Sequence, residues 1–197
     1  MKKTLALALG LSLLGMSANA TTVFSDNFDA NNYGLNTTPL GWTLNSGSVD
    51  IIGDGQFAWY GAGNYIDMNG STQVAGSIST TLTGLVAGAS YALDFDVGFN
   101  NGSGNNEKLS YSIGTLSGSY GPPIASGNST FLHLRFAFIA GGTSAVLTFA
   151  DAGNTPNDNG GPILDNVSVT AVPVPAAGGL LLSALGGVAM LRRRKKA

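Results

Sequence analysis

Aromatic rings are the side chains of this 197-residue chain with the clearest capacity to bind a ligand. A sugar is held by flat rings that cover its apolar face and by polar groups that satisfy its hydroxyls. We single out Trp42, Trp59 and Tyr60, the last two adjacent in a stretch bordered by glycines. At least one ring of that pair is expected to face outward. These three residues are the predicted carbohydrate contacts, and burial in a core is the alternative for each.

The carboxylates offer little for catalysis. Asp94 and Asp96 lie two residues apart on one predicted strand, about 7 Å by strand rise, which is a workable spacing for a glycosidase pair. Solvation of both is the alternative. His133 is the only histidine, Glu107 is the only glutamate and there is no cysteine, so zinc and thiol chemistry are disfavoured. We predict that the chain is not an enzyme, with a glycan-active enzyme kept as an alternative.

The segments that carry these residues alternate between apolar and polar side chains, with the period of two that is typical of a β-strand. In residues 91–99 every odd residue is large and apolar, and every even residue is small or acidic. Residues 131–140 carry His133 and Arg135 on the face opposite a row of Leu and Phe. Shorter alternating runs separated by Gly- and Asn-rich turns occupy residues 78–82, 109–113, 145–149 and 167–169. The prediction is an all-β domain over residues 21–171, an antiparallel β-sandwich of nine to eleven strands in a jelly roll.

The charge of this domain restricts its partners. Residues 21–171 hold two basic residues, Lys108 and Arg135, against all eleven acidic ones, which gives a net charge of −9. Nucleic acid and anionic membrane surfaces attract positive charge, so neither is an expected partner. An acidic, cysteine-free domain of this size fits an extracellular protein that folds without disulfides.

Three short motifs resemble galactose-binding-like jelly rolls. They are an opening Ser25-Asp26-Asn27-Phe28-Asp29 with Gly41-Trp42, a central stretch over residues 84–91, and a closing stretch over residues 164–169. That superfamily includes carbohydrate-binding modules and plain adhesion domains. Many members hold a structural Ca²⁺ where the first strand meets the last, and the matching positions here are Asp26, Asp29 and Asp165. The alternative is that these carboxylates cap turns, so no cofactor is certain.

The first twenty residues have the three parts of a secretory signal peptide. Lys2 and Lys3 precede an apolar stretch, and Ala18-Asn19-Ala20 fits the small-x-small rule for signal-peptidase cleavage. The mature chain is expected to begin near Thr21, and an uncleaved anchor is the alternative.

The last twenty-six residues, 172–197, form a second targeting segment. A predicted transmembrane helix over residues 176–191 lacks charge and would extend about 24 Å, a short membrane span. The basic tail, residues 192–197, is expected to stay cytoplasmic, which leaves the domain outside.

This arrangement resembles the PEP-CTERM class of sorting signals. The opening Val172-Pro173-Val174-Pro175-Ala176 is similar to the VPLPA-CTERM variant, with Val174 where that variant has Leu. The resemblance implies an exosortase-type transpeptidase as partner and delivery from an inner-membrane intermediate to the cell surface or extracellular matrix of a Gram-negative bacterium. A permanent anchor is the alternative. The main prediction is thus a structural or adhesive envelope protein, and the alternative is a module that recognises extracellular polysaccharide.

Overall fold

The computed structural model describes residues 20–53, 56–57, 60–99, 107–121, 130–153 and 159–173. One compact unit spans Ala20–Val172. The predicted signal peptide other than Ala20, and the predicted sorting segment from Val174 onward, lie outside the described residues. No helix that is long and apolar enough to cross a membrane occurs among the residues the structure does describe.

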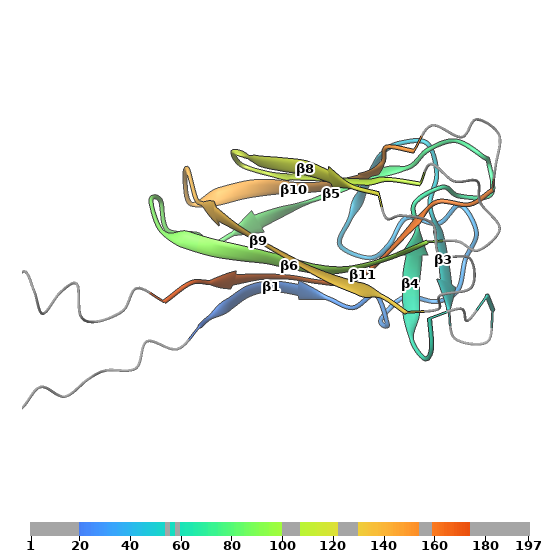
Figure 1. Cartoon of the computed structure of the whole chain (residues 1–197), viewed down its shortest axis with the longest axis horizontal. Helices are drawn as coiled ribbons and strands as arrows, with labels where there is room; N and C mark the ends of the chain where they lie inside the picture. The colour runs from blue at the N-terminus through green and yellow to red at the C-terminus, as the bar shows by residue number, and fades with distance from the viewer. Residues whose placement is uncertain are drawn as a thin grey trace, which may run out of the picture. The chain divides into compact units, whose positions relative to one another are not determined.

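Two antiparallel sheets face each other in separate layers (Figure 1). The smaller sheet has five strands, in the order β2 (Thr43–Ser46), β5 (Ser77–Thr83), β10 (Ser144–Asp151), β7 (Leu109–Ile113) and β8 (Leu116–Tyr120). The larger sheet has six, in the order β3 (Asp50–Gly53), β4 (Asn64–Asp67), β11 (Pro162–Ala171), β6 (Ser90–Phe99) and β9 (Leu132–Ile139), with β1 (Thr22–Asp26) also paired to β11. The predicted antiparallel β-sandwich is confirmed.

β11 organises the larger sheet. It pairs with β6 along one edge, while its other edge pairs first with β4, at Ile163 and Leu164, and then with β1, from Val167 to Thr170. Figure 1 shows the consequence: β1 continues beside β11 at one end, and β3 and β4 lie at the other end. The β3–β4 pair therefore extends the sheet only at that second end.

Alternation along the strands separates the core from the outer face, as expected from the sequence. On β6 the side chains of Tyr91, Leu93, Phe95 and Val97 are buried between the sheets. The residues between them face outward, because successive side chains of a strand point to opposite sides. The polar positions of β6 are thereby directed to one shared outer surface.

Trp42 lies in the core and does not form a surface platform. Its side chain is only 7% exposed, and its ring contacts Phe24, Phe28 and Phe149 at centroid distances of 5.9, 5.8 and 6.1 Å. Its indole N–H donates a 2.8 Å hydrogen bond to Asp26 Oδ2. A buried indole with a satisfied N–H stabilises the sandwich, and its faces are closed to a glycan.

We expect Trp42→Ala to lower the free energy of unfolding by about 3–5 kcal/mol, because it removes buried ring surface and leaves a cavity. Urea unfolding followed by circular dichroism measures the loss. Leu40→Ala, two residues away at a side chain that is 65% exposed, is the control and should change stability by less than about 0.5 kcal/mol. Equal effects of the two variants would contradict the core assignment.

Candidate functional site

The outer face of the larger sheet gathers polar residues from five strands. The registers of these strands align the polar residues in rows across the sheet. The rows are Asp50–Asp67–Ile163–Gly98, then Asp165–Asp96–His133, then Asp94–Arg135. Residues separated by more than a hundred positions in the sequence are thereby brought onto one surface.

Asp94, Asp96, His133 and Arg135 form a connected polar network on this face. Arg135 donates to both carboxylate oxygens of Asp94, at 2.9 and 3.1 Å. His133 bridges the two acids, with Nδ1 2.8 Å from Asp96 Oδ1 and Nε2 3.3 Å from Asp94 Oδ1. The hydrogen bond to Asp96 raises the pKa of His133, and both negative charges act in the same direction. The two acids are thus engaged by basic side chains, which weakens the glycosidase alternative for this pair.

A bulge in β11 extends the network. The register shifts by one residue between Asp165 and Ser168, and Asn166 adopts a left-handed backbone with φ of 48°. This turns the Asn166 side-chain amide toward Asp96, which accepts a 2.9 Å hydrogen bond from it. Bulges re-aim single side chains in this way. Burial raises the pKa of Asp165 to about 7, helped by the negative charges of nearby acids, among them Asp96.

Asp26, Asp29 and Asp165, the predicted calcium ligands, lie near enough that the charges of Asp26 and Asp29 raise the pKa of Asp165. Each carboxylate also accepts hydrogen bonds from the chain itself. Asp26 binds Trp42 Nε1 and the Phe28 amide, Asp29 binds the Asn64 amide at 2.8 Å, and Asp165 binds the Asn166 amide at 2.6 Å. No group of three or more His, Asp or Glu suited to a metal ion occurs in the described part of the chain. These hydrogen bonds fit the turn-capping alternative, and the calcium site stays a prediction.

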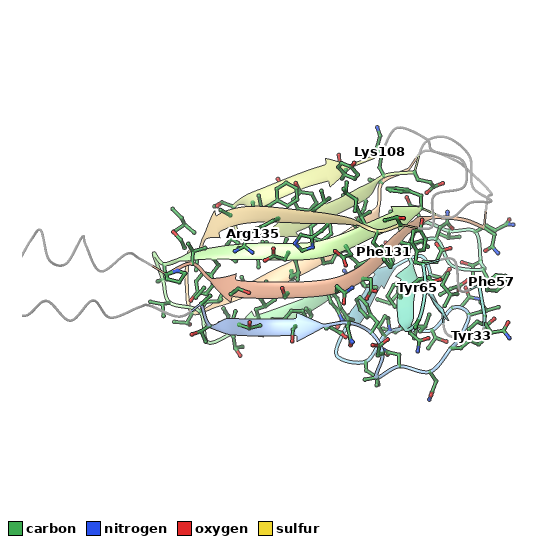
Figure 2. All side chains as sticks on the ribbon, turned by 60° about the horizontal axis from the view of Figure 1, so that its bottom comes forward. Tyr33, Phe57, Tyr65, Lys108, Phe131 and Arg135 are labelled. Carbon is green, nitrogen blue, oxygen red and sulfur yellow. The ribbon has the colours of Figure 1, made fainter. Side chains whose placement is uncertain are left out.

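A small aromatic cluster covers the end of the same face. Tyr60 stacks on Phe131 with 4.4 Å between centroids, and both rings contact Tyr65 edge-on. The Tyr60 hydroxyl bonds the backbone of Phe99, and its ring lies over Gly98, where a Cβ would come within 2.5 Å of it. Figure 2 shows Phe131 and Tyr65 together toward this end, and Arg135 farther along the sheet. The Tyr60 side chain is therefore half-buried and packs against neighbouring rings. Trp59 lies outside the described residues.

A pocket of about 240 Å³ opens beside this cluster. Its lining consists of Leu35, Asp50, Ile52, Phe57, Asp67, Ser71 and Asn159. Asp50 and Asp67 are directly paired across β3 and β4, and their side chains are 5% and 3% exposed. Phe57 is 51% exposed and Leu35 is 45% exposed. The pocket thus combines buried carboxylates with open apolar surface.

Asp50 is held in place by its neighbours. Its Oδ1 accepts the amide N–H groups of Asn36 at 2.7 Å and Ser71 at 3.0 Å. Its Oδ2 accepts the Ser71 hydroxyl at 2.7 Å. Three donors from two loops give this carboxylate one orientation, which is a property of preorganised binding groups.

Phe57 is presented by a strained backbone. Its φ is 54°, a left-handed value that is unfavourable for a bulky residue. Gly53 and Gln56, which precede it, exchange two backbone hydrogen bonds, and the Phe57 carbonyl accepts the Tyr65 hydroxyl at 2.6 Å. Strain of this kind persists only where surrounding contacts enforce it, and it is concentrated at functional positions.

The pocket residues were missed by reasoning from the sequence. The short runs Asp50–Gly53 and Asn64–Asp67 do not alternate clearly, although each carries an acid and an apolar residue on one side. Pairing these two runs would have aligned Asp50 with Asp67. The cue was weak because each strand is only four residues long.

Comparison with known proteins identifies a family model that matches residues 22–170, described as "Protein of unknown function (DUF642)". No curated protein matches the chain.

Several solved structures are similar. TmCBM61, solved with β-1,4-galactotriose, has a TM-score of 0.48 and 10% identity over 68% of this chain and 90% of its own. The adhesin domain K2 of Lys-gingipain has 0.46 and 12% over 77% and 98%. The carbohydrate-binding module CBM6cm-2 of Cellvibrio mixtus lichenase 5A has 0.42 and 14% over 78% and 100%. The chain spans only 20% of a bacteriophage CBA120 tailspike enzyme domain that it also resembles. At these TM-scores and identities, the likenesses assign no ligand to this chain.

The raised pKa of Asp165 predicts that the stability of the fold depends on pH. Since its pKa is about 7 in the folded protein and near 3.8 in an unfolded chain, the folded state binds this proton more tightly between those values. Its contribution to stability therefore falls as pH rises from about 4 to 7. Asp165→Asn, which removes the buried charge, should match the parent's melting temperature near pH 4 and exceed it by a few degrees at pH 8.

Melting curves from pH 4 to pH 8 measure this difference. Asp151→Asn, on β10 of the other sheet, is the control, because Asn can still accept the Gly153 amide that Asp151 binds at 2.7 Å. A melting-temperature difference for Asp165→Asn that does not change with pH would show that Asp165 carries no raised pKa.

Proposed function

The chain belongs to the DUF642 family of proteins of unknown function, and we propose that it binds carbohydrate through the pocket lined by Asp50, Asp67 and Phe57. The single observation that carries this proposal is the pairing of buried, oriented carboxylates with an exposed aromatic ring in one hollow. This is the pairing of ring and polar groups that a sugar requires. The proposal favours the polysaccharide-binding alternative over a purely structural role.

The size of the pocket limits what it can hold. Pockets for drug-sized ligands measure roughly 300–1,000 Å³, and this one is about 240 Å³. A single sugar ring, at the end of a glycan or as a branch, suits that volume. A polysaccharide would then be held by one residue, with the rest of the chain lying over the outer face.

The residues that line the pocket match both the hydroxyl groups and the apolar C–H face of a sugar ring. Hydroxyl groups donate to acceptors, and the Asp50 carboxylate, the Ser71 hydroxyl and the Asn159 amide all include acceptor oxygens. The C–H surface of a sugar ring packs on apolar groups, which Phe57, Leu35 and Ile52 supply. Binding without turnover is proposed, and the acids of the β6–β9 network act as structural partners of His133 and Arg135.

The two ends of the chain support a proposal about location. We propose that residues 1–20 are removed by signal peptidase and that residues 172–197 direct sorting by an exosortase-type enzyme. The domain, a galactose-binding-like jelly roll in this proposal, would then act at the cell surface or in the extracellular matrix. Its net charge of −9 over residues 21–171 suits a soluble exterior.

Phe57→Gly tests the binding proposal. Glycine adopts positive φ without strain, so stability should be unchanged or higher, while loss of the ring should weaken sugar binding roughly three- to tenfold. Titration calorimetry with a glycan that binds the parent, alongside urea unfolding, measures both effects. Val146→Ala, at a 53% exposed side chain on the smaller sheet, is the control. Full retention of binding by Phe57→Gly would remove the ring from the site.

Intact-mass measurement of the protein from its native host tests the location proposal. We expect loss of residues 1–20 and of a C-terminal piece that starts near Pro175. A mature protein that retains Arg192 to Lys196 would point to a permanent anchor.

A further inference from the structure

We infer that the pocket selects an amino sugar, a ring with a free ammonium group, over neutral and acidic sugars. This inference rests on the proposed carbohydrate binding at the same pocket and adds the ligand class. Its basis is the buried Asp50 carboxylate, whose hydrogen-bond donors are neutral, with a second acid, Asp67, opposite it in the same pocket.

Asp50 carries a buried charge whose partners are all neutral. Its three hydrogen bonds come from two backbone amides and one hydroxyl. Buried carboxylates are usually paired with a cation, because a charge removed from water is costly. Asp67 brings a second carboxylate directly opposite on the neighbouring strand, and like charges in that position are unfavourable. A cationic ligand group between them would relieve both costs.

The basic residues of the domain that the structure describes lie away from the pocket lining. Arg135 and His133 bind Asp94 and Asp96, on a different row of the sheet. Lys108 is the other basic residue of the domain, and its side chain lies beside Gly121, next to the smaller sheet. The cation that would balance the pocket can therefore come from a ligand.

Asp50 retains an acceptor position for such a group. A carboxylate has about four lone-pair sites, and two on Oδ1 and one on Oδ2 accept the bonds from Asn36 and Ser71. The fourth, on Oδ2, can accept an ammonium N–H. A hydroxyl and an ammonium group can both donate there, but only the ammonium adds the attraction between opposite charges, so this position favours an amine over a hydroxyl.

The rest of the lining favours an organic cation over a metal ion. Calcium takes six to eight oxygen ligands, whereas Phe57, Leu35 and Ile52 form an apolar wall. An exposed aromatic ring also attracts an ammonium group over its face. An amino sugar satisfies the wall with its C–H face and the carboxylates with its ammonium. A uronic acid would place a third negative charge beside Asp50 and Asp67.

The experiment is titration calorimetry of the full-length protein with matched monosaccharides at pH 6. The panel is D-glucosamine, D-glucose, N-acetyl-D-glucosamine and D-glucuronic acid, and the four galacto counterparts. We expect the amino sugar of one series to bind about tenfold more tightly than its neutral parent. The preference should fall with added salt and as pH rises through the pKa of the sugar amine, and the acidic sugar should bind weakest.

Variants assign the preference to the pocket. Asp50→Asn should weaken amino-sugar binding far more than neutral-sugar binding, so that their affinity ratio approaches one. Asp67→Asn is the second variant should Asp50→Asn not fold, as judged by its circular dichroism spectrum. Asp151→Asn, outside the pocket, should keep the ratio of the parent.

The outcomes distinguish failure of the amino-sugar inference from failure of the proposed carbohydrate binding. Equal affinity for the amino sugar and its parent, tighter binding of the N-acetylated or acidic sugar, or a ratio unchanged in Asp50→Asn would overturn the amino-sugar inference and leave sugar binding standing. Saturable binding of Ca²⁺ alone that Asp50→Asn abolishes would also overturn it. Binding of no sugar in the panel or of any longer glycan would overturn the proposed function as well.

Discussion

The pairing of β11 on both of its edges is the constraint on which the outer face depends. β6 holds one edge along the strand, while β4 and then β1 share the other. The exchange of partners takes place at Asp165 and Asn166, where the strand bulges. Because the side-chain period of a strand is two, an extra residue at this point decides which side chains face outward beyond it. The bulge thus keeps Val167 and Val169 in the core and directs Asn166 to the polar network.

The position of β4 beside only the first part of β11 explains the pocket. With β3 it forms the end of the sheet, and the loops that approach this end bring Asn36 and Ser71 to Asp50. Phe57 follows Gln56, which is hydrogen-bonded to Gly53 at the end of β3, and the Tyr65 hydroxyl of β4 donates to the Phe57 carbonyl. The hollow is therefore assembled by loops that converge on the last two strands, which is a common origin of binding sites on rigid scaffolds. The two acids of the β6–β9 network, by comparison, lie on the long strand β6 and are hydrogen-bonded by His133, Arg135 and Asn166.

Strong alternation allowed two long strands, and the side of each that faces the core, to be predicted. Residues 91–99 and 131–140 were expected as strands with Asp94, Asp96, His133 and Arg135 on their polar sides, and β6 and β9 have that arrangement. Their mutual pairing was not predictable, because antiparallel partners are chosen by packing between segments far apart in sequence. Trp42 was selected for its ring and not for its surroundings, and only the fold shows Phe24, Phe28 and Phe149 packed around it.

By itself, the sequence determined the all-β class, the single acidic domain and the polar sides of its longest strands. These properties depend on local periodicity and composition, which are present in the chain before it folds. Only the tertiary structure decided that Asp50 and Asp67 are buried as neighbours, that Phe57 is exposed beside them and that Trp42 is not. Burial and proximity are relations between distant segments, and they arise when the sheets pack and the bulge of β11 sets the register.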